Sequence, residues 1–234
     1  MKKIIKFLFI SQFIIFSPLL FSQSKDEKIT ERSYISSEVT VIGSKSNSLR
    51  TVTSSAVPID IINSDEIAQS GATELTQLIN YIIPSFSSER QTFADGNDHS
   101  EPATLRNLGP DQVLVLINGK RRHRTSLVTV TPVVGKGSVG VDFNTIPINS
   151  IDRIEVLRDG AATQYGSDAI AGVINIILKN STNNLTMNAI SGITSQGDGF
   201  FYNAGFNYGF NLPKNGFFNI SIDAKKREPT NRNG

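Results

Sequence analysis

Glycines gather in residues 151–179, between two segments that are typical of strands, and a glycine-rich loop of this kind can hold a phosphate. A P-loop requires the pattern G-x-x-x-x-G-K-[ST], in which the lysine and the hydroxyl residue reach the phosphates and the metal. Here Gly160 and Gly166 are six residues apart, and Ser167 and Asp168 follow them. No G-x-G-x-x-G motif opens a helix either. The segment therefore argues against a nucleotide site, and its glycines are expected to serve backbone geometry.

Other catalytic and metal-binding patterns are also missing from the sequence. Cysteine is absent, and His99 and His123 are the only histidines, which excludes a thiolate site and a histidine cluster at ligand spacing. The motifs G-x-S-x-G and H-E-x-x-H do not occur. The acidic residues that could serve in general acid and base catalysis are not spaced as a pair of carboxylates. These residues are Asp95, Asp98, Glu101 and Asp111. We expect neither catalysis, nor a cofactor, nor a metal site.

The most concentrated charge is the basic run Lys120–Arg124, with the sequence KRRHR. Such a run can bind nucleic acid, but no aromatic residues are interleaved with it and no nucleic-acid-binding motif stands beside it. The formal net charge of the chain is only +2. We therefore expect no nucleic-acid partner, and a solvated hairpin arm is the simpler interpretation of the run.

The N-terminus has the layout of a secretory signal peptide. Met1–Lys6 is basic, and Phe7–Ser22 is mostly apolar and is followed by small or polar residues. The apolar stretch is too short for a membrane-spanning helix, and Pro18 interrupts it, which disfavours the alternative of an N-terminal anchor helix. We predict a signal peptide over residues 1–23, with cleavage between Ser22 and Ser24.

Residues 24–48 form a polar leader that contains one short extended segment. The segment alternates in hydrophobicity and precedes a Ser/Lys/Asn-rich stretch. It consists of Glu38, Val39, Thr40, Val41 and Ile42. Two interpretations stay open: the segment is the first strand of the domain that follows, or it is a tethered peptide that adds as a strand to the sheet edge of a partner.

Residues 49–180 predict an α/β (α+β) domain with a small mixed β-sheet and short helices. Strand patterns alternate with two short helices, and Asn118-Gly119 is a strong two-residue hairpin signal. Ser64 is the expected cap of the first helix, and Pro84 is expected to end the second. The expected strands are Val57–Ile62, Ala103–Leu105, Val113–Ile117, Arg153–Leu157 and Val173–Leu178. Three helical segments are expected: one that follows Ser64 and ends before Gly71, one from Thr73 to before Pro84, and a single turn over Ala161–Tyr165.

After residue 180 the pattern changes to three long alternating segments. Apolar and aromatic residues occupy every second position, while Asn, Gly, Ser and Thr fill the others. Each segment has about ten residues, the length that a tilted transmembrane β-strand needs. A soluble sandwich with one buried face is the alternative. The apolar positions are Leu185, Met187, Ala189 and Ile193, then Phe200, Tyr202, Ala204, Phe206, Tyr208 and Phe210, then Phe218, Ile220, Ile222 and Ala224.

Two signatures carry a family resemblance. The segment IDRIEVLRDGAATQYGSDAIAGVINIILK resembles the C-terminal signature of the plug domain of TonB-dependent outer-membrane receptors, with Asp159-Gly160 where the family usually has Gly-Pro. The segment ATLRNLGPDQVLVLINGKRRH resembles the family's middle signature, with Asn107 in place of a glycine. If that position requires a positive φ, asparagine is the next most tolerant residue.

The resemblance implies a receptor that resides in the outer membrane and is energised through the periplasmic domain of TonB. It implies a plug over residues 49–180, and the first antiparallel strands of a transmembrane β-barrel over residues 181–234. Because three strands cannot close a barrel, we expect the chain to be an N-terminal fragment. The segment Glu38–Ile42 would be the TonB box, and outer-membrane lipid would contact the barrel strands.

The implied substrate is a small molecule or a metal chelate such as a ferric siderophore. Basic side chains near the outside face could attract such an anion. The candidates are Arg121, Arg122, His123 and Arg124. Two alternatives to the receptor stay open: a soluble periplasmic plug-like binding module and a nonfunctional gene remnant.

Overall fold

The computed structural model describes residues 59–88, 103–130, 134–158, 162–214 and 216–230. The predicted signal peptide, the leader and the segment Glu38–Ile42 lie outside the described residues. Among the helices of the described part, none is long and apolar enough to cross a membrane.

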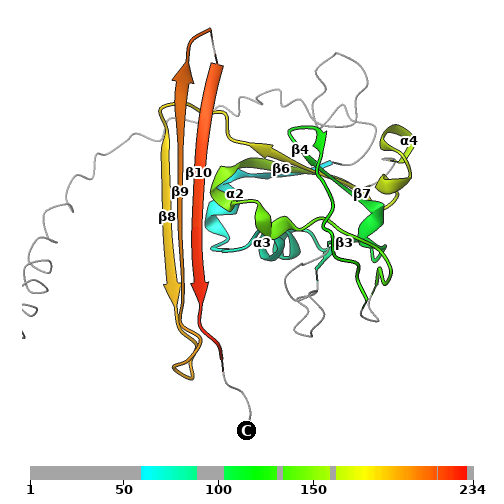
Figure 1. The fold of residues 1–234 in the computed structure, drawn as a ribbon, viewed down its shortest axis with the longest axis horizontal. Helices are drawn as coiled ribbons and strands as arrows, with labels where there is room; N and C mark the ends of the chain where they lie inside the picture. Colours follow the sequence, from blue (N-terminus) through cyan, green and yellow to red (C-terminus); the bar gives the residue numbers. More distant parts are fainter. Residues whose placement is uncertain (1–58, 89–102, 131–133, 159–161, 215, 231–234) are drawn as a thin grey trace, which may run out of the picture. The chain divides into compact units, whose positions relative to one another are not determined.

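The described part begins with an α/β domain built on a five-stranded sheet (Figure 1). The strand order is β1-β6-β7-β4-β5; the β4–β7 pair is parallel and the other pairs are antiparallel. This arrangement confirms the predicted mixed sheet. The strands are β1 (Ile59–Asn63), β4 (Val113–Ile117), β5 (Lys120–Arg121), β6 (Ile151–Leu157) and β7 (Gly172–Leu178). A separate short pair joins β2 (Phe86–Ser87) to β3 (Thr104–Leu105).

Two helices, α2 (Ser64–Gln69) and α3 (Leu75–Ile82), pack on one face of this sheet. Their apolar side chains meet those of the central strands, where burial of apolar area supplies most of the stability. The main residues of this core are Ile67, Leu75, Leu78, Ile79, Phe143, Ile154, Val156, Ile174 and Ile176. The opposite face has a smaller core that includes Leu114, Leu116, Leu157 and Val173, together with Ala169 from the segment that follows β6.

The predicted starts of both helices were wrong by one or two residues. The N-cap of α2 is Asn63, not Ser64, because Asn63 still has extended backbone angles and its N–H donates to the Glu66 carboxylate at 2.9 Å. This reciprocal arrangement is a capping box. Helix α3 begins at Leu75, since Glu74 is extended and forms the cap.

Backbone geometry explains several residues of the two signatures. Asn107 has a φ of 58°, which confirms that its position needs a left-handed conformation, and Arg106 before it has 56°. Asn118 and Gly119 have φ values of 49° and 76° and connect β4 to β5 as predicted. Gly166 has a φ of 101° after the helical turn α4 (Ala162–Tyr165). The segment continues through the 3-10 turn η6 (Ser167–Ala169) into β7.

The C-terminal part of the described chain is a three-stranded antiparallel sheet in the order β10-β9-β8. The strands are β8 (Leu185–Gly192), β9 (Phe201–Leu212) and β10 (Gly216–Arg227), visible as three long arrows in Figure 1. Met187, Phe206 and Ile222 lie opposite one another in the register. We call this sheet the strand wall.

Candidate functional site at the contact between the α/β domain and the strand wall

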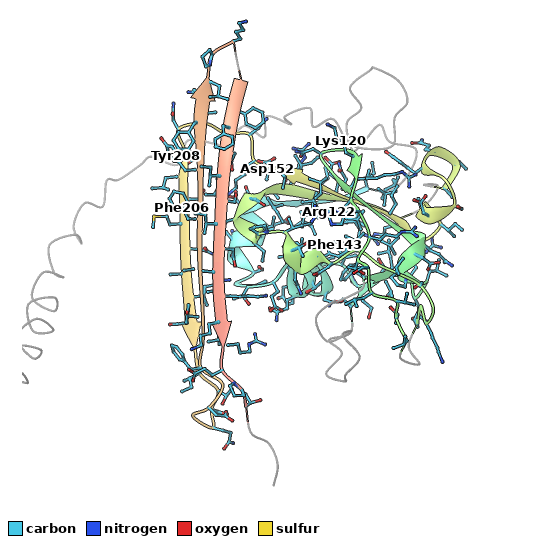
Figure 2. The ribbon with its side chains drawn as sticks, viewed as in Figure 1. Lys120, Arg122, Phe143, Asp152, Phe206 and Tyr208 are labelled. Atoms are coloured by element: carbon cyan, nitrogen blue, oxygen red, sulfur yellow. The ribbon has the colours of Figure 1, made fainter. Side chains whose placement is uncertain are left out.

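In the strand wall the apolar face is exposed and the small and polar face is turned inward, the reverse of a sheet that packs on a water-soluble core. On β9 the small and polar residues Asn203, Gly205, Asn207 and Gly209 are buried, whereas Tyr202 and Phe210 are more than two-fifths exposed. Figure 2 shows Phe206 and Tyr208 on the face turned away from the α/β domain. The predicted aromatic face is therefore exposed, which removes the soluble-sandwich alternative for these strands.

The exposed face is apolar along most of its length. Met187 is 69% exposed and Ile222 is 58% exposed. Aromatic side chains gather toward the β9–β10 hairpin, where Tyr208 and Phe210 make an edge-on contact with ring centroids 4.7 Å apart, and Tyr202 lies near the other end of β9. Lys226 is exposed near the C-terminal end of β10, and its ammonium lies 3.8 Å from the Glu228 carboxylate. An apolar band with aromatic ends is the pattern of a lipid-facing barrel surface.

The buried face of the wall receives the 3-10 turn η5 (Ile148–Ser150) of the α/β domain. The Asn149 side-chain amide donates to the Asn188 side-chain oxygen on β8 at 2.8 Å. Opposite it, a Cβ atom on Gly205 would lie 1.5 Å from Asn149 Nδ2 and 2.3 Å from Asn188 Oδ1. A side chain at position 205 would therefore displace the Asn149 and Asn188 side chains and disturb their hydrogen bond.

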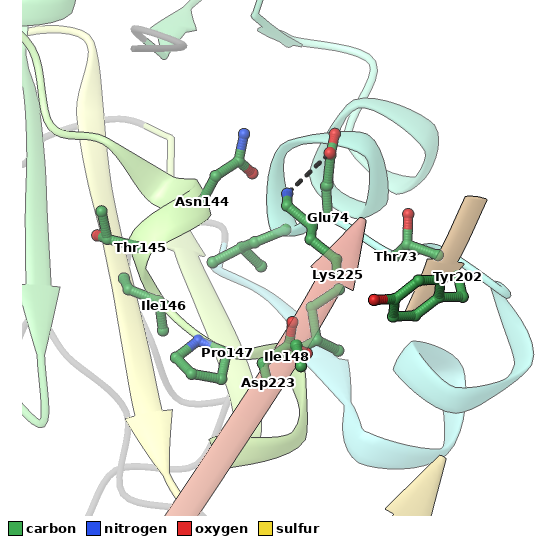
Figure 3. Close-up of a pocket in the computed structure, with 12 residues that line it drawn as sticks. Thr73, Glu74, Asn144, Thr145, Ile146, Pro147, Ile148, Tyr202, Asp223 and Lys225 are labelled. Carbon is green, nitrogen blue, oxygen red and sulfur yellow. Dashed lines mark hydrogen bonds and ion pairs between the residues drawn. The ribbon is translucent and has the colours of Figure 1, made fainter. Parts of the chain in front are cut away.

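A second contact joins the cap of α3 to β10. Lys225 Nζ lies 2.9 Å from Glu74 Oε1, and the Glu74 side chain is 8% exposed whereas that of Lys225 is 45% exposed. Figure 3 shows the pair at the edge of a cavity of about 460 Å³. Thr73, Asn144, Thr145, Pro147 and Asp223 also line this cavity. Because water reaches the lysine, this contact is weaker than a fully enclosed pair.

The basic run does not form a common pocket. The Arg121 guanidinium pairs with Asp168 and also donates to the Tyr165 carbonyl oxygen. Arg122 Nη2 lies 3.4 Å from Thr145 Oγ1, and Arg124 Nη2 lies 3.3 Å from the Asp111 carbonyl oxygen. His123 is exposed. Three of the four predicted ligand residues thus contact their own domain, and the run does not line the cavities of about 310, 460 and 540 Å³ among the described residues.

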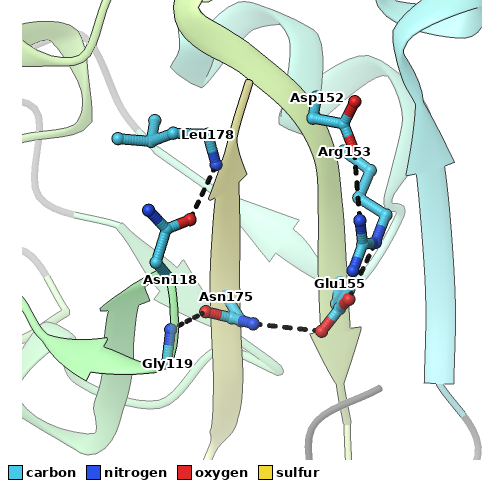
Figure 4. Close-up of polar contacts among 7 residues, drawn as sticks. All are labelled: Asn118, Gly119, Asp152, Arg153, Glu155, Asn175 and Leu178. Carbon is cyan, nitrogen blue, oxygen red and sulfur yellow. Dashed lines mark hydrogen bonds and ion pairs between the residues drawn. The ribbon is translucent and has the colours of Figure 1, made fainter. Parts of the chain in front are cut away.

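A buried polar network ties three strands of the five-stranded sheet together (Figure 4). The fully buried Glu155 carboxylate accepts from Asn175 Nδ2 at 3.0 Å and from Arg153 Nε at 3.0 Å. The Asn175 side-chain oxygen then accepts from the Gly119 N–H at 3.0 Å. The Asn118 side-chain oxygen accepts from the Leu178 N–H at 2.9 Å. These bonds fix the β4–β5 hairpin on β7 and hold β7 against β6.

Lys179 follows β7 at the start of the connection to the strand wall. Burial lowers the pKa of its ammonium, and the carboxylate of Asp152 opposes part of that shift. Among the described residues, no group of three or more His, Cys, Asp or Glu side chains could hold a metal ion.

The residues at the two contacts and in the network were not identified from the sequence. Glu74 and Lys225 are 151 residues apart, and single-sequence periodicity does not reveal such a pair. An acid within an apolar strand and an Asn within the run VINIIL were the available signals for Glu155 and Asn175.

Comparisons with known proteins agree with this architecture. The family described as TonB-dependent Receptor Plug Domain matches residues 51–173. The vitamin B12 transporter BtuB of Vibrio cholerae serotype O1 is 36% identical over 126 residues, which is 54% of this chain and 18% of the transporter. The ferric enterobactin receptor of Pseudomonas aeruginosa is 30% identical over 128 residues, which is 54% of this chain and 17% of the receptor. The chain thus spans about a fifth of the length of these relatives or slightly less.

Solved structures share the fold. The siderophore receptor PirA from Pseudomonas aeruginosa has a TM-score of 0.52 and 26% identity, over 73% of this chain and 28% of that receptor. The siderophore receptor PirA from Acinetobacter baumannii has a TM-score of 0.55 and 24% identity, over 75% of this chain and 25% of that receptor. Since the family match alone spans more than half of its residues, the chain belongs to the TonB-dependent receptor plug domain family.

Proposed function

We propose that this chain supplies the plug and the first wall strands of an outer-membrane receptor for the energised uptake of a scarce ligand. The proposed plug is the α/β domain described above. Relatives are named as vitamin B12 transporters and ferric enterobactin receptors. From these names we propose a ferric siderophore or a ligand of similar size as the substrate. Transport requires no chemical conversion, so no catalytic residue is assigned.

The observation that carries this proposal is the reversed polarity of the strand wall. On β9 its small and polar face is buried, and apolar residues of the other face are exposed on all three strands, among them Met187, Phe210 and Ile222. In water such a face would be an exceptionally large apolar patch. In a bilayer the same face is favourable, because lipid tails cover it while the backbone groups stay paired between strands.

The basic run is the proposed attraction site for an anionic ligand. Asp168 balances the charge of Arg121. The cations Lys120, Arg122 and Arg124 therefore contribute most of the remaining positive field. We propose this role for the group as a whole, acting over distance and not through one shaped pocket.

The proposed energy input enters through the leader. The segment Glu38–Ile42 is extended in its sequence pattern and lies upstream of the plug, where it could add as a strand to the sheet edge of the TonB periplasmic domain. Backbone hydrogen bonds would supply the affinity, and a pull on this segment would be transmitted to β1, the edge strand of the plug sheet.

The test is a binding titration. A peptide that covers residues 36–44 is mixed with the TonB periplasmic domain, and the same peptide with Thr40→Pro serves as the control. Binding is expected for the first peptide and a clear loss for the second, because proline cannot donate to a strand ladder. A peptide that shows no binding at high micromolar concentration would remove residues 38–42 from the mechanism.

A further inference from the structure

We infer that the plug separates from the strand wall first at the Glu74–Lys225 contact and turns about the seat formed by η5 and Gly205. This inference deepens the proposed function, because it names the side on which the plug begins to move. The two contacts differ in exposure to water and in their distance from the covalent connection between plug and wall.

The seat is largely buried and lies next to the covalent connection. Asn149 is 7% exposed and bonds to Asn188, and both side chains lie in close contact with Gly205. The Lys179 N–H donates to the Ser150 carbonyl oxygen at 2.8 Å, so η5 is fixed to the end of β7. Strand β8 begins only a few residues later, at Leu185. A rotation about this point would disturb few contacts and would not stretch the chain.

The contact at Glu74 and Lys225 has the opposite properties. It joins residues 151 positions apart, and the lysine is almost half exposed. Both contacts border cavities, of about 460 Å³ beside Glu74 and about 310 Å³ beside Asn149, so the difference between them is the exposure of the lysine to water. Separation at this contact breaks an ion pair that water already reaches, and such pairs contribute little to stability. It is therefore the less costly place for the plug to leave the wall.

Amide hydrogen exchange on the full receptor chain in detergent tests this order. The Leu78 N–H donates to the Glu74 carbonyl oxygen at 3.2 Å and reports on the first turn of α3. The Lys179 N–H reports on the seat. Lys225→Met is expected to accelerate exchange at Leu78 roughly two- to fivefold, the range of a partly exposed ion pair, and to leave Lys179 unchanged.

The neighbouring lysine provides a matched control. Lys226 is on the opposite face of β10 and contacts Glu228, so Lys226→Met is expected to change neither amide. Lys225→Gln keeps a donor without the charge, and it serves as the second variant if Lys225→Met does not fold.

Two results would overturn the inference. One is an unchanged Leu78 rate in both Lys225 variants. The other is an equal acceleration at Leu78 and Lys179, which would mean that the plug leaves the wall as one body. Because the measurement needs neither TonB nor a ligand, its failure is distinct from failure of the peptide titration described above.

Discussion

Glu155 shows how one buried charge can organise a sheet. Its carboxylate is fully buried, yet it accepts from Asn175 on the neighbouring strand β7 and from Arg153 on its own strand β6. A buried carboxylate is costly unless its oxygens are bonded, and here both oxygens have donors. Asn175 also accepts from the Gly119 N–H, so the position of the hairpin depends on the same group.

Removal of this carboxylate is expected to destabilise the plug. Glu155→Ala should lower the free energy of unfolding by about 2–3 kcal/mol, because buried donors lose their acceptor. The measurement is urea unfolding followed by circular dichroism. Asp152→Asn is the matched control: Asp152 contacts the same arginine at 3.1 Å, but its side chain is 45% exposed, so a change below about 0.5 kcal/mol is expected. Equal losses in both variants would contradict the role given to Glu155.

Some residues with special backbone angles could be predicted from the sequence, whereas the positive φ of Arg106 and the long-range pairs could not. Asn107, Gly119 and Gly166 follow from local steric rules, and each has a positive φ. Glu155 and Asn175 required knowledge of which strands are neighbours. The same limit applies to Glu74 and Lys225, whose contact depends on how β10 lies against the plug.

At the scale of elements, alternation along β8, β9 and β10 predicts which face is buried. A period of two assigns successive side chains to opposite faces, and the observed burial follows that assignment on β9. Element ends were less predictable. The N-cap moved from Ser64 to Asn63 because the capping box, not the residue type alone, decides where the helix begins.

Two adjacent residues of β8 test the lipid-facing assignment. Met187→Lys is expected to destabilise the folded receptor in lipid vesicles by about 2–4 kcal/mol, the cost of a lysine near the middle of a bilayer. Thr186→Lys is the control, since Thr186 is half-buried on the other face of β8, where a lysine would not enter lipid. Urea unfolding in vesicles, monitored by gel mobility, measures both. Equal stability of the two variants would argue against lipid on the Met187 face.

At the scale of the whole molecule, the sequence predicted the mixed α/β class and the change to long alternating strands after residue 180. The strand order β1-β6-β7-β4-β5 and the parallel β4–β7 pairing were not predicted. Periodicity in the sequence indicates which face of each strand is buried, but not which strands are neighbours. Many different strand orders would bury the same faces, so the pairing could not be predicted. The two signatures identified the family without specifying this topology.

Cell fractionation tests the location of the molecule. The receptor is expected in the outer-membrane fraction after an alkaline carbonate wash, because its exposed apolar strands need lipid. A soluble periplasmic maltose-binding protein, released by osmotic shock, serves as the control for leakage. Recovery of the folded chain wholly in the periplasmic extract would favour the soluble binding module.

The missing side chain at Gly205 also bears on electrical leakage. A contact that leaves no room for a methyl group also leaves none for water molecules, and hydrated ions pass only where water does. Any resting conductance of the receptor in a planar bilayer would therefore pass through the cavities of about 310 Å³ and about 460 Å³ that adjoin η5, and not through the contact of Gly205 with Asn149. The glycine thus closes that one point of the contact to ions.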